Sequence, residues 1–161
     1  MSRKVVWNAC YGGFNLSPLA TKMFYERKHP GKTLYVYVIT SHYFEREDKK
    51  DVYTKVKDPE NFKGSIVFYV TKDFGDEVMI PEKEKYGGKK KKFFDKCIFF
   101  DDEIERHDPD LVAVVEELGS KRASGYCAEL EITDIGDSLY HIDDYDGYES
   151  VITSLGDDYW K

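Results

Sequence analysis

Residues 5–25 read VVWNACYGGFNLSPLATKMFY, and how this stretch turns decides the fold of the chain. The apolar run at 5–7 predicts a strand. Gly12-Gly13 interrupts it, because glycine takes backbone angles that are closed to other residues. Ser17-Pro18 then opens a helix, so the stretch predicts a strand, a tight turn and a helix in succession.

The helix in this stretch has a well-marked start and end. The Ser17 hydroxyl can accept a hydrogen bond from a free N–H of the first turn. Pro18 suits the first helical position, where its missing N–H is not needed. Pro30 disfavours helical angles in the residue before it, so we expect the helix to occupy residues 17–29.

A glycine turn that leads into a helix presents free N–H groups and a partial positive charge, which suits a bound anion. The spacing here is neither GxGxxG nor GxxxxGK[ST], so the standard nucleotide-binding fingerprints are absent. Two interpretations follow: a structural turn before a capped helix, or a binding edge. The candidate ligand-binding residues of that edge are Cys10, Tyr11, Gly12, Gly13, Phe14, Asn15 and Ser17.

The composition is that of a globular protein in which acidic residues outnumber basic ones. The chain has 161 residues, of which 41% are hydrophobic and 34% charged, and its formal net charge is −7. Broad nucleic-acid binding needs a basic face, so this balance argues against nucleic acid as a partner. No apolar run is long enough to span a bilayer and no secretory signal opens the chain, so we expect no membrane association.

The three cysteines, Cys10, Cys97 and Cys127, are far apart in the sequence. They make neither a disulfide framework nor a zinc-binding set, so we expect a reducing, intracellular compartment. Cys10 lies between a strand and a helix start, where a thiol can become a nucleophile, but no histidine stands at a motif spacing from it. A buried structural thiol is the simpler interpretation.

Acidic residues supply the other candidates for chemistry. Asp101-Asp102-Glu103 with Glu105 offers neighbouring carboxylates, which could do acid–base work if their pKa values were pushed apart. The fragment at 144–147, DYDG, resembles part of a calcium loop, but the EF-hand register would place Ile142 and Thr153 at its first and twelfth positions. Turn formation explains these aspartates, so no metal or cofactor is predicted.

Runs of β-branched and aromatic residues predict five strands in the first two thirds of the chain, at 4–8, 33–40, 65–71, 77–80 and 93–100. The first helix lies between the first two strands, which suggests a βαβ-like opening. A turn at 74–76 would pair the third and fourth strands as a hairpin. The stretch at 82–92 contains four consecutive lysines and predicts a solvated loop.

The clearest helix begins at Asp108-Pro109, an N-cap followed by a proline at the first helical position. Its apolar face has helical spacing and comprises Leu111, Val112, Val115 and Leu118. Gly119 weakens the helix interior by about 1 kcal/mol relative to alanine. Gly125 suits a left-handed position after the helix.

The C-terminal part predicts a strand at 127–132 and a hairpin of residues 139–143 and 148–152 around Asp146-Gly147, a pair that favours tight hairpin turns. We therefore expect a single α+β domain over residues 1–161. It would have a mixed, mostly antiparallel sheet, two principal helices and a C-terminal β-hairpin. Residues 41–96 would be an elaboration that carries the lysine-rich loop.

Four sequence motifs occur together in this chain. They are N-x-C-Y-G-G-F-x-L-S at 8–17, D-P-x-L-V-x-V-V-E-E-L-G at 108–119, A-x-G at 123–125 and Y-D-G-x-E at 145–149. Together they resemble a family of small viral proteins of the tailed-phage type, over about half of the chain. Residues 41–96 and the acidic end of the chain depart from that pattern. The resemblance implies a virus-encoded protein that acts in an infected cell, and it implies no catalytic residue.

Three function hypotheses follow. The first is a viral accessory protein, not an enzyme, that binds a host protein or a small anionic ligand in the host cytoplasm through the glycine turn. The second is a small enzyme that acts on a nucleotide or a modified peptide, with Cys10 or an acidic pair as its chemistry. The third is a structural component of the virion. The sequence predicts no oligomeric state.

Overall fold

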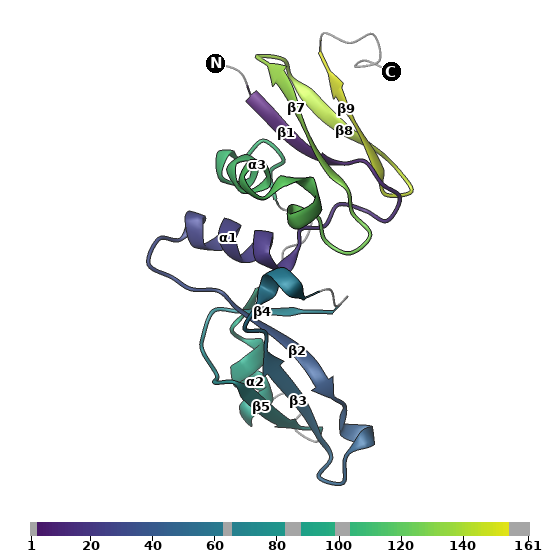
Figure 1. Ribbon diagram of the computed structural model, residues 1–161. Coiled ribbons are helices and arrows are strands. Elements are labelled where there is room, and N and C mark those ends of the chain that lie inside the picture. Colours follow the sequence, from purple (N-terminus) through teal and green to yellow (C-terminus); the bar gives the residue numbers. More distant parts are fainter. Residues whose placement is uncertain (1–2, 63–65, 83–87, 99–103, 155–161) are drawn as a thin grey trace. The chain divides into compact units, whose positions relative to one another are not determined.

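Figure 1 shows the computed structural model, which describes residues 3–62, 66–82, 88–98 and 104–154. The chain divides into two compact units, of which unit 1 is Met1–Lys28 with Asp102–Lys161 and unit 2 is His29–Asp101. Both units contain helices and strands, and every strand pair among the described residues is antiparallel. The α+β class is therefore present, and the single domain expected over the whole chain stays a prediction.

Unit 1 packs two helices and two pairs of strands. Its elements are β1 (Arg3–Asn8), α1 (Pro18–Lys28), α3 (Pro109–Ala123), β7 (Leu130–Gly136), β8 (Tyr140–Tyr145) and β9 (Tyr148–Thr153). β1 pairs with β7, and β8 pairs with β9 as the expected C-terminal hairpin. α3 packs on β1 and β7, and α1 packs on α3 (Figure 1). Fully buried side chains include Val5, Val6, Ala20, Leu111 and Val114.

The expected βαβ-like opening is wrong. β1 pairs with β7, whereas β2 (Tyr35–Ser41) belongs to a separate sheet in unit 2. The spacing of strand, helix and strand was compatible with a parallel pair but did not require one. The apolar run of β1 finds its partner more than a hundred residues later in the chain.

The predicted helix caps are confirmed. The Ala20 N–H donates to the Ser17 hydroxyl at 3.1 Å, and the Asp110 N–H donates to the Asp108 carboxylate at 2.8 Å. Gly119 does more than weaken α3, since its φ of 80° and ψ of 164° put a kink inside the helix. The left-handed angle expected for Gly125 is wrong. A Cβ at Gly125 would lie 1.7 Å from the side-chain oxygen of Asn15, so close packing is what requires glycine there.

We predict that Asp108→Asn removes part of the pH dependence of stability below about pH 4. Burial acts to raise the pKa of Asp108, but hydrogen bonds from Lys28 and from the Asp110 N–H outweigh it, so the pKa is lowered. Stability from a carboxyl with a lowered folded pKa is present above its unfolded pKa and is lost as the pH falls through the folded pKa.

Asparagine keeps a capping oxygen at this position, so the variant isolates the loss of charge. At pH 7 the free energy of unfolding should fall by no more than about 1 kcal/mol, because the Lys28 side chain is 38% exposed and solvent screens its pair with Asp108. Urea unfolding at pH 7, 5, 3 and 2 measures the difference between variant and wild type, which should shrink toward zero at the lowest pH. A constant difference across this range would contradict the prediction.

Unit 2 is built on a five-stranded antiparallel sheet with the order β5-β3-β2-β4-β6. Its strands are β2, β3 (Lys50–Lys55), β4 (Phe68–Val70), β5 (Glu77–Pro81) and β6 (Cys97–Ile98), and its helices are η1 (Tyr43–Glu45), η2 (Pro59–Asn61) and α2 (Gly88–Phe94). Tyr37, Tyr53 and Phe93 form the centre of its core. The Tyr37 and Phe93 rings meet edge to face at 5.5 Å.

Several predictions for unit 2 are wrong. The expected hairpin at 74–76 does not form, because β4 pairs with β2 and β6 while β5 pairs with β3, a strand that the sequence did not predict. Part of the expected loop at 82–92 is helix α2, and residues 83–87 lie outside the described residues. The strand expected at 93–100 is only Cys97–Ile98 among the described residues, because Phe93 and Phe94 belong to α2.

In the described parts of the chain, no helix combines the length and the apolar character of a membrane span.

Candidate functional site

The glycine turn lies at the surface of unit 1. Residues 9–15 connect β1 to Leu16, which is buried and forms an isolated bridge with Ser124. Tyr11 and Gly12 are exposed, and Gly12 and Gly13 have φ angles of 134° and 94°. The turn is therefore accessible, as the sequence predicted for a binding edge.

The turn is packed backbone to backbone against two other loops. A Cβ at Gly147 would lie 2.3 Å from the backbone nitrogen of Gly13, and a Cβ at Gly12 would lie 2.7 Å from the carbonyl oxygen of Cys127. Only glycine allows these approaches. We call the meeting of residues 9–15, 125–128 and 145–148 the three-loop junction.

The Asn8 side chain links the three segments near the three-loop junction by hydrogen bonds. This side chain is fully buried. The amide nitrogen donates to the carbonyl oxygens of Cys10 at 2.7 Å and Gly147 at 2.8 Å, and the amide oxygen accepts from the Glu129 N–H at 2.8 Å. One side chain thus satisfies backbone groups of three separate segments, which a buried polar side chain must do to avoid a loss of stability.

A buried ion pair lies beside Asn8. Arg106 donates to both carboxylate oxygens of Glu149, at 2.5 Å and 2.8 Å, and Glu149 also accepts from the Asn8 N–H at 2.9 Å. The Glu149 side chain is only 4% exposed. The guanidinium of Arg106 stacks on the ring of Phe14, with its central carbon 3.6 Å from the ring centroid. Arg106 therefore connects β9 to the glycine turn.

The three loops carry four exposed tyrosines, which we call the tyrosine face. They are Tyr11, Tyr126, Tyr145 and Tyr148, with exposed fractions of 60%, 69%, 78% and 39%. Each lies in one of the three loops or at its edge. The Tyr11 and Tyr148 rings contact each other, with their centroids 5.3 Å apart. Exposed large apolar side chains that gather at one place are typical of an interaction surface.

The tyrosine face is accompanied by carboxylates. Asp143, Asp144 and Asp146 are exposed on the same hairpin. Asp144 accepts from the Gly147 N–H at 2.8 Å and so stabilises the turn. Within the described part of the chain, neither Asp143 nor Asp146 has an ion-pair partner. These two carboxylates are available to a cation from outside.

The start of α1 is occupied by protein groups. The Ser17 hydroxyl donates to the carbonyl oxygen of Arg122 at 2.7 Å, and the Ser17 N–H donates to that of Ala123 at 2.8 Å. The Gly125 N–H likewise donates to the carbonyl oxygen of Asn15 at 2.9 Å. The structure therefore separates the predicted site residues into two groups. Cys10 to Phe14 lie in the three-loop junction, whereas Asn15, at the end of this loop, and Ser17 hold the segment at the end of α3.

The candidates for catalysis do not come together as a set among the described residues. The Cys10 thiol lies 3.4 Å from the carbonyl oxygen of Tyr11. Asp101, Asp102 and Glu103 lie outside the described residues. Glu105 lies 3.6 Å from the Nε2 atom of His107. Among the described residues, no group of three or more metal-ligating side chains could hold an ion.

Unit 1 also has a groove of about 480 Å³ beside α3. Pro109, Val112 and Ala113 supply its apolar lining, and charged residues surround it. Glu116 pairs with Lys4 at 3.0 Å, and Glu117 pairs with Arg27. Because these charges are already compensated, the groove is a weaker candidate than the tyrosine face.

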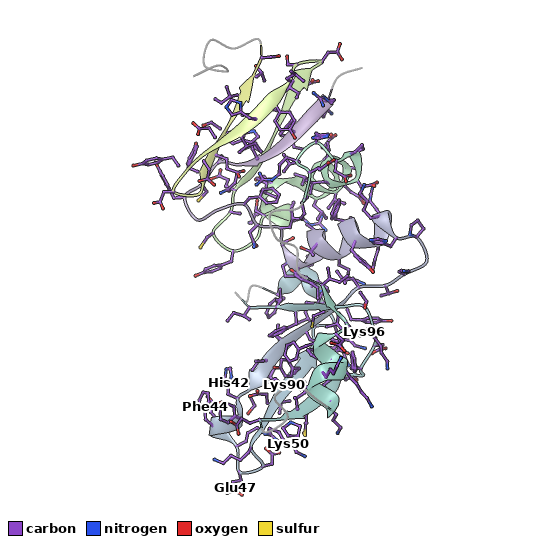
Figure 2. All side chains as sticks on the ribbon, turned by 180° about the vertical axis from the view of Figure 1, so that it is seen from behind. His42, Phe44, Glu47, Lys50, Lys90 and Lys96 are labelled. Atoms are coloured by element: carbon purple, nitrogen blue, oxygen red, sulfur yellow. The ribbon has the colours of Figure 1, made fainter. Side chains whose placement is uncertain are left out.

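A smaller aromatic group lies in unit 2, at the connection between β2 and β3. The rings of His42 and Phe44 stack with centroids 5.2 Å apart and an interplanar angle of 8°. Figure 2 shows both at the end of unit 2 where Glu47 also lies. The pair is small, and its two rings contact each other.

Sequence reasoning missed Arg106 and Tyr126 as parts of the site. Arg106 stands in a charged segment before the second helix, and nothing local indicates that it reaches Glu149. Tyr126 stands in a short stretch without periodicity. One signal was present: Asn8, Gly125 and Glu149 all occur in the motifs quoted above, and the structure brings these motifs together.

No protein-family model, no curated protein and no solved structure matches this chain.

Proposed function

We propose that this chain is a virus-encoded accessory protein that binds a host protein through the tyrosine face. The viral origin is an inference from the motifs at 8–17, 108–119 and 145–149 alone. The binding role depends on one observation: three loops that meet carry four exposed tyrosines, two of which are in ring contact. Tyrosine is enriched at protein interfaces because its ring buries a large area at low cost in conformational entropy while its hydroxyl stays hydrogen-bonded.

The geometry favours a protein over a small anionic ligand. An anion at the start of α1 would need free N–H or hydroxyl donors, and Ser17 donates both of its hydrogens to the end of α3. The tyrosine face instead offers ring surface and hydroxyls spread over three loops. Such a face suits a partner of comparable size. The buried Asn8 side chain and the Arg106–Glu149 ion pair hold the loops in place before binding, which lowers the entropic cost of association.

Affinity capture from a host-cell lysate tests this proposal. The wild-type chain should retain a host protein, and Tyr11→Ala/Tyr148→Ala should reduce the retained amount by about tenfold or more, as expected when interface tyrosines are truncated. Tyr43→Ala is the matched control, because Tyr43 lies in unit 2 and is 37% exposed, close to the 39% of Tyr148. It should leave retention unchanged.

Circular dichroism and the melting temperature must show that the double variant is folded. Equal retention by the folded double variant and the wild type would contradict the proposal. Native mass measurement of the captured material also detects a bound small molecule. A small anion that is retained by the wild type and by the double variant alike would support the alternative of a small ligand.

A further inference from the structure

We propose that the partner presents an arginine-bearing basic segment to the tyrosine face. This inference rests on the proposed function, since it names the chemistry of the partner for the same surface. It depends on the position of carboxylates next to exposed rings on the hairpin, on the charge of unit 1, and on an arginine site of the same kind inside the protein.

The strand register of the hairpin places rings and a carboxylate on one face. Tyr145 pairs with Tyr148 and Asp143 pairs with Ser150. Residues directly opposite each other in an antiparallel pair point to the same side, and so do residues two apart along one strand. Tyr145, Tyr148 and Asp143 therefore share a face, and Asp146 stands in the adjoining turn with a φ of 52°.

A guanidinium fits this combination better than an ammonium does. The planar guanidinium of arginine stacks on an aromatic ring and at the same time donates two parallel hydrogen bonds to a carboxylate. A lysine ammonium is a point charge that is strongly hydrated and cannot stack in this way. Cation–π contacts with tyrosine add to the attraction.

The protein uses the same combination internally. Arg106 stacks on Phe14, which lies in the glycine turn, and donates to both oxygens of Glu149, which follows Tyr148 in the chain. An aromatic ring and a carboxylate brought together by these loops thus hold an arginine within the protein. The rings of the tyrosine face and the carboxylates of Asp143 and Asp146 repeat these components at the surface.

The charge of unit 1 favours a basic partner. Unit 1 contains 9 Lys and Arg residues against 18 Asp and Glu residues, which gives a formal net charge of −9. Unit 2 contains 15 basic against 13 acidic residues. The acid excess of the chain thus belongs to the unit that carries the tyrosine face. Such a field raises the rate of association with a basic partner and opposes an acidic one.

The test measures binding of fluorescent nonapeptides to the full chain. One peptide alternates Gly and Arg, the second alternates Gly and Lys at the same charge, and the third alternates Gly and Glu. The arginine peptide should bind about tenfold more tightly than the lysine peptide, with an affinity that falls as salt is added, and the glutamate peptide should not bind. Equal affinity for the arginine and lysine peptides, or no binding of either, would overturn the inference.

Two pairs of substitutions with the same change of charge separate the site from the general field. Asp143→Asn/Asp146→Asn should weaken binding of the arginine peptide about tenfold. Glu131→Gln/Asp134→Asn on β7 should change it by less than about twofold, since both side chains are exposed on another strand. Equal losses from both pairs would show attraction by net charge alone and would overturn the inference.

The outcomes also distinguish this inference from the proposed function. If capture of a host protein depends on Tyr11 and Tyr148 but not on Asp143 and Asp146, the arginine inference fails and the proposed function stands. If capture is independent of the tyrosines, the proposed function fails. A dimer of this chain that is lost in Tyr11→Ala/Tyr148→Ala would identify a second copy as the occupant and would overturn the arginine inference.

Discussion

Replacing Glu149 with alanine is expected to lower the free energy of unfolding of unit 1 by about 3–5 kcal/mol. The substitution leaves the Arg106 guanidinium without its partner while the side chain is still only 19% exposed and stacked on Phe14. It also leaves the Asn8 N–H without its acceptor. Removing one member of a buried pair is costly because the remaining charge has lost its compensation in a place that water reaches poorly.

Urea unfolding followed by tryptophan fluorescence measures this effect, because Trp7 lies in β1 next to Asn8. Glu116→Ala is the matched control, since its pair with Lys4 at 3.0 Å is exposed and should be worth less than about 1 kcal/mol. Glu149→Gln keeps an acceptor for the Asn8 N–H and should fall between the two. If Glu149→Ala costs no more than Glu116→Ala, the ion pair does not hold the three-loop junction.

The local part of the fold could be predicted from the sequence, because local chemistry determines it. Ser17 and Asp108 are confirmed as helix caps by hydrogen bonds within three residues. Asp146-Gly147 is confirmed as a tight hairpin turn, with φ angles of 52° and 86°. In each case the residues that fix the structure are neighbours in the chain, so their types alone are informative.

The pairing of strands could not be predicted in the same way. The partner of β1 is β7, and nothing in the strand-forming residues of β1 specifies a partner so distant in sequence. α2 was mistaken for a loop because four lysines dominate its composition. The Phe93 side chain is nonetheless fully buried among the tyrosines of the sheet, and this tertiary contact overrides the local signal.

The candidate site, like the fold, could be predicted only where local residues determine it. The sequence indicated an accessible glycine turn and named Tyr11, Gly12 and Gly13 within it. It did not indicate that Tyr148 would contact Tyr11, because the tyrosine face exists only once three distant loops meet. A surface made from three segments has no signature in any one of them.

Gly147→Ala is expected to lower the free energy of unfolding by about 3 kcal/mol or more, through two effects that add. Gly147 has a φ of 86°, and a residue with a Cβ loses about 1–2 kcal/mol in that region. The new Cβ would also lie 2.3 Å from the backbone nitrogen of Gly13 and 2.7 Å from that of Gly12. Backbone atoms cannot move aside as a flexible side chain can, so the hairpin and the glycine turn must separate.

Gly31→Ala provides the control for the first effect, because Gly31 has a φ of 85° and nothing lies within 4 Å of the position of its Cβ. Its cost should be the backbone strain alone, and the difference between the two variants in urea unfolding then measures the close approach of the loops.

Because the separated loops would carry Tyr148 away from Tyr11, Gly147→Ala should also lose binding at the tyrosine face under conditions where the rest of unit 1 stays folded. Equal costs for Gly147→Ala and Gly31→Ala would mean that the loops tolerate separation, and the tyrosine face would then lack the rigid support that the proposed binding requires.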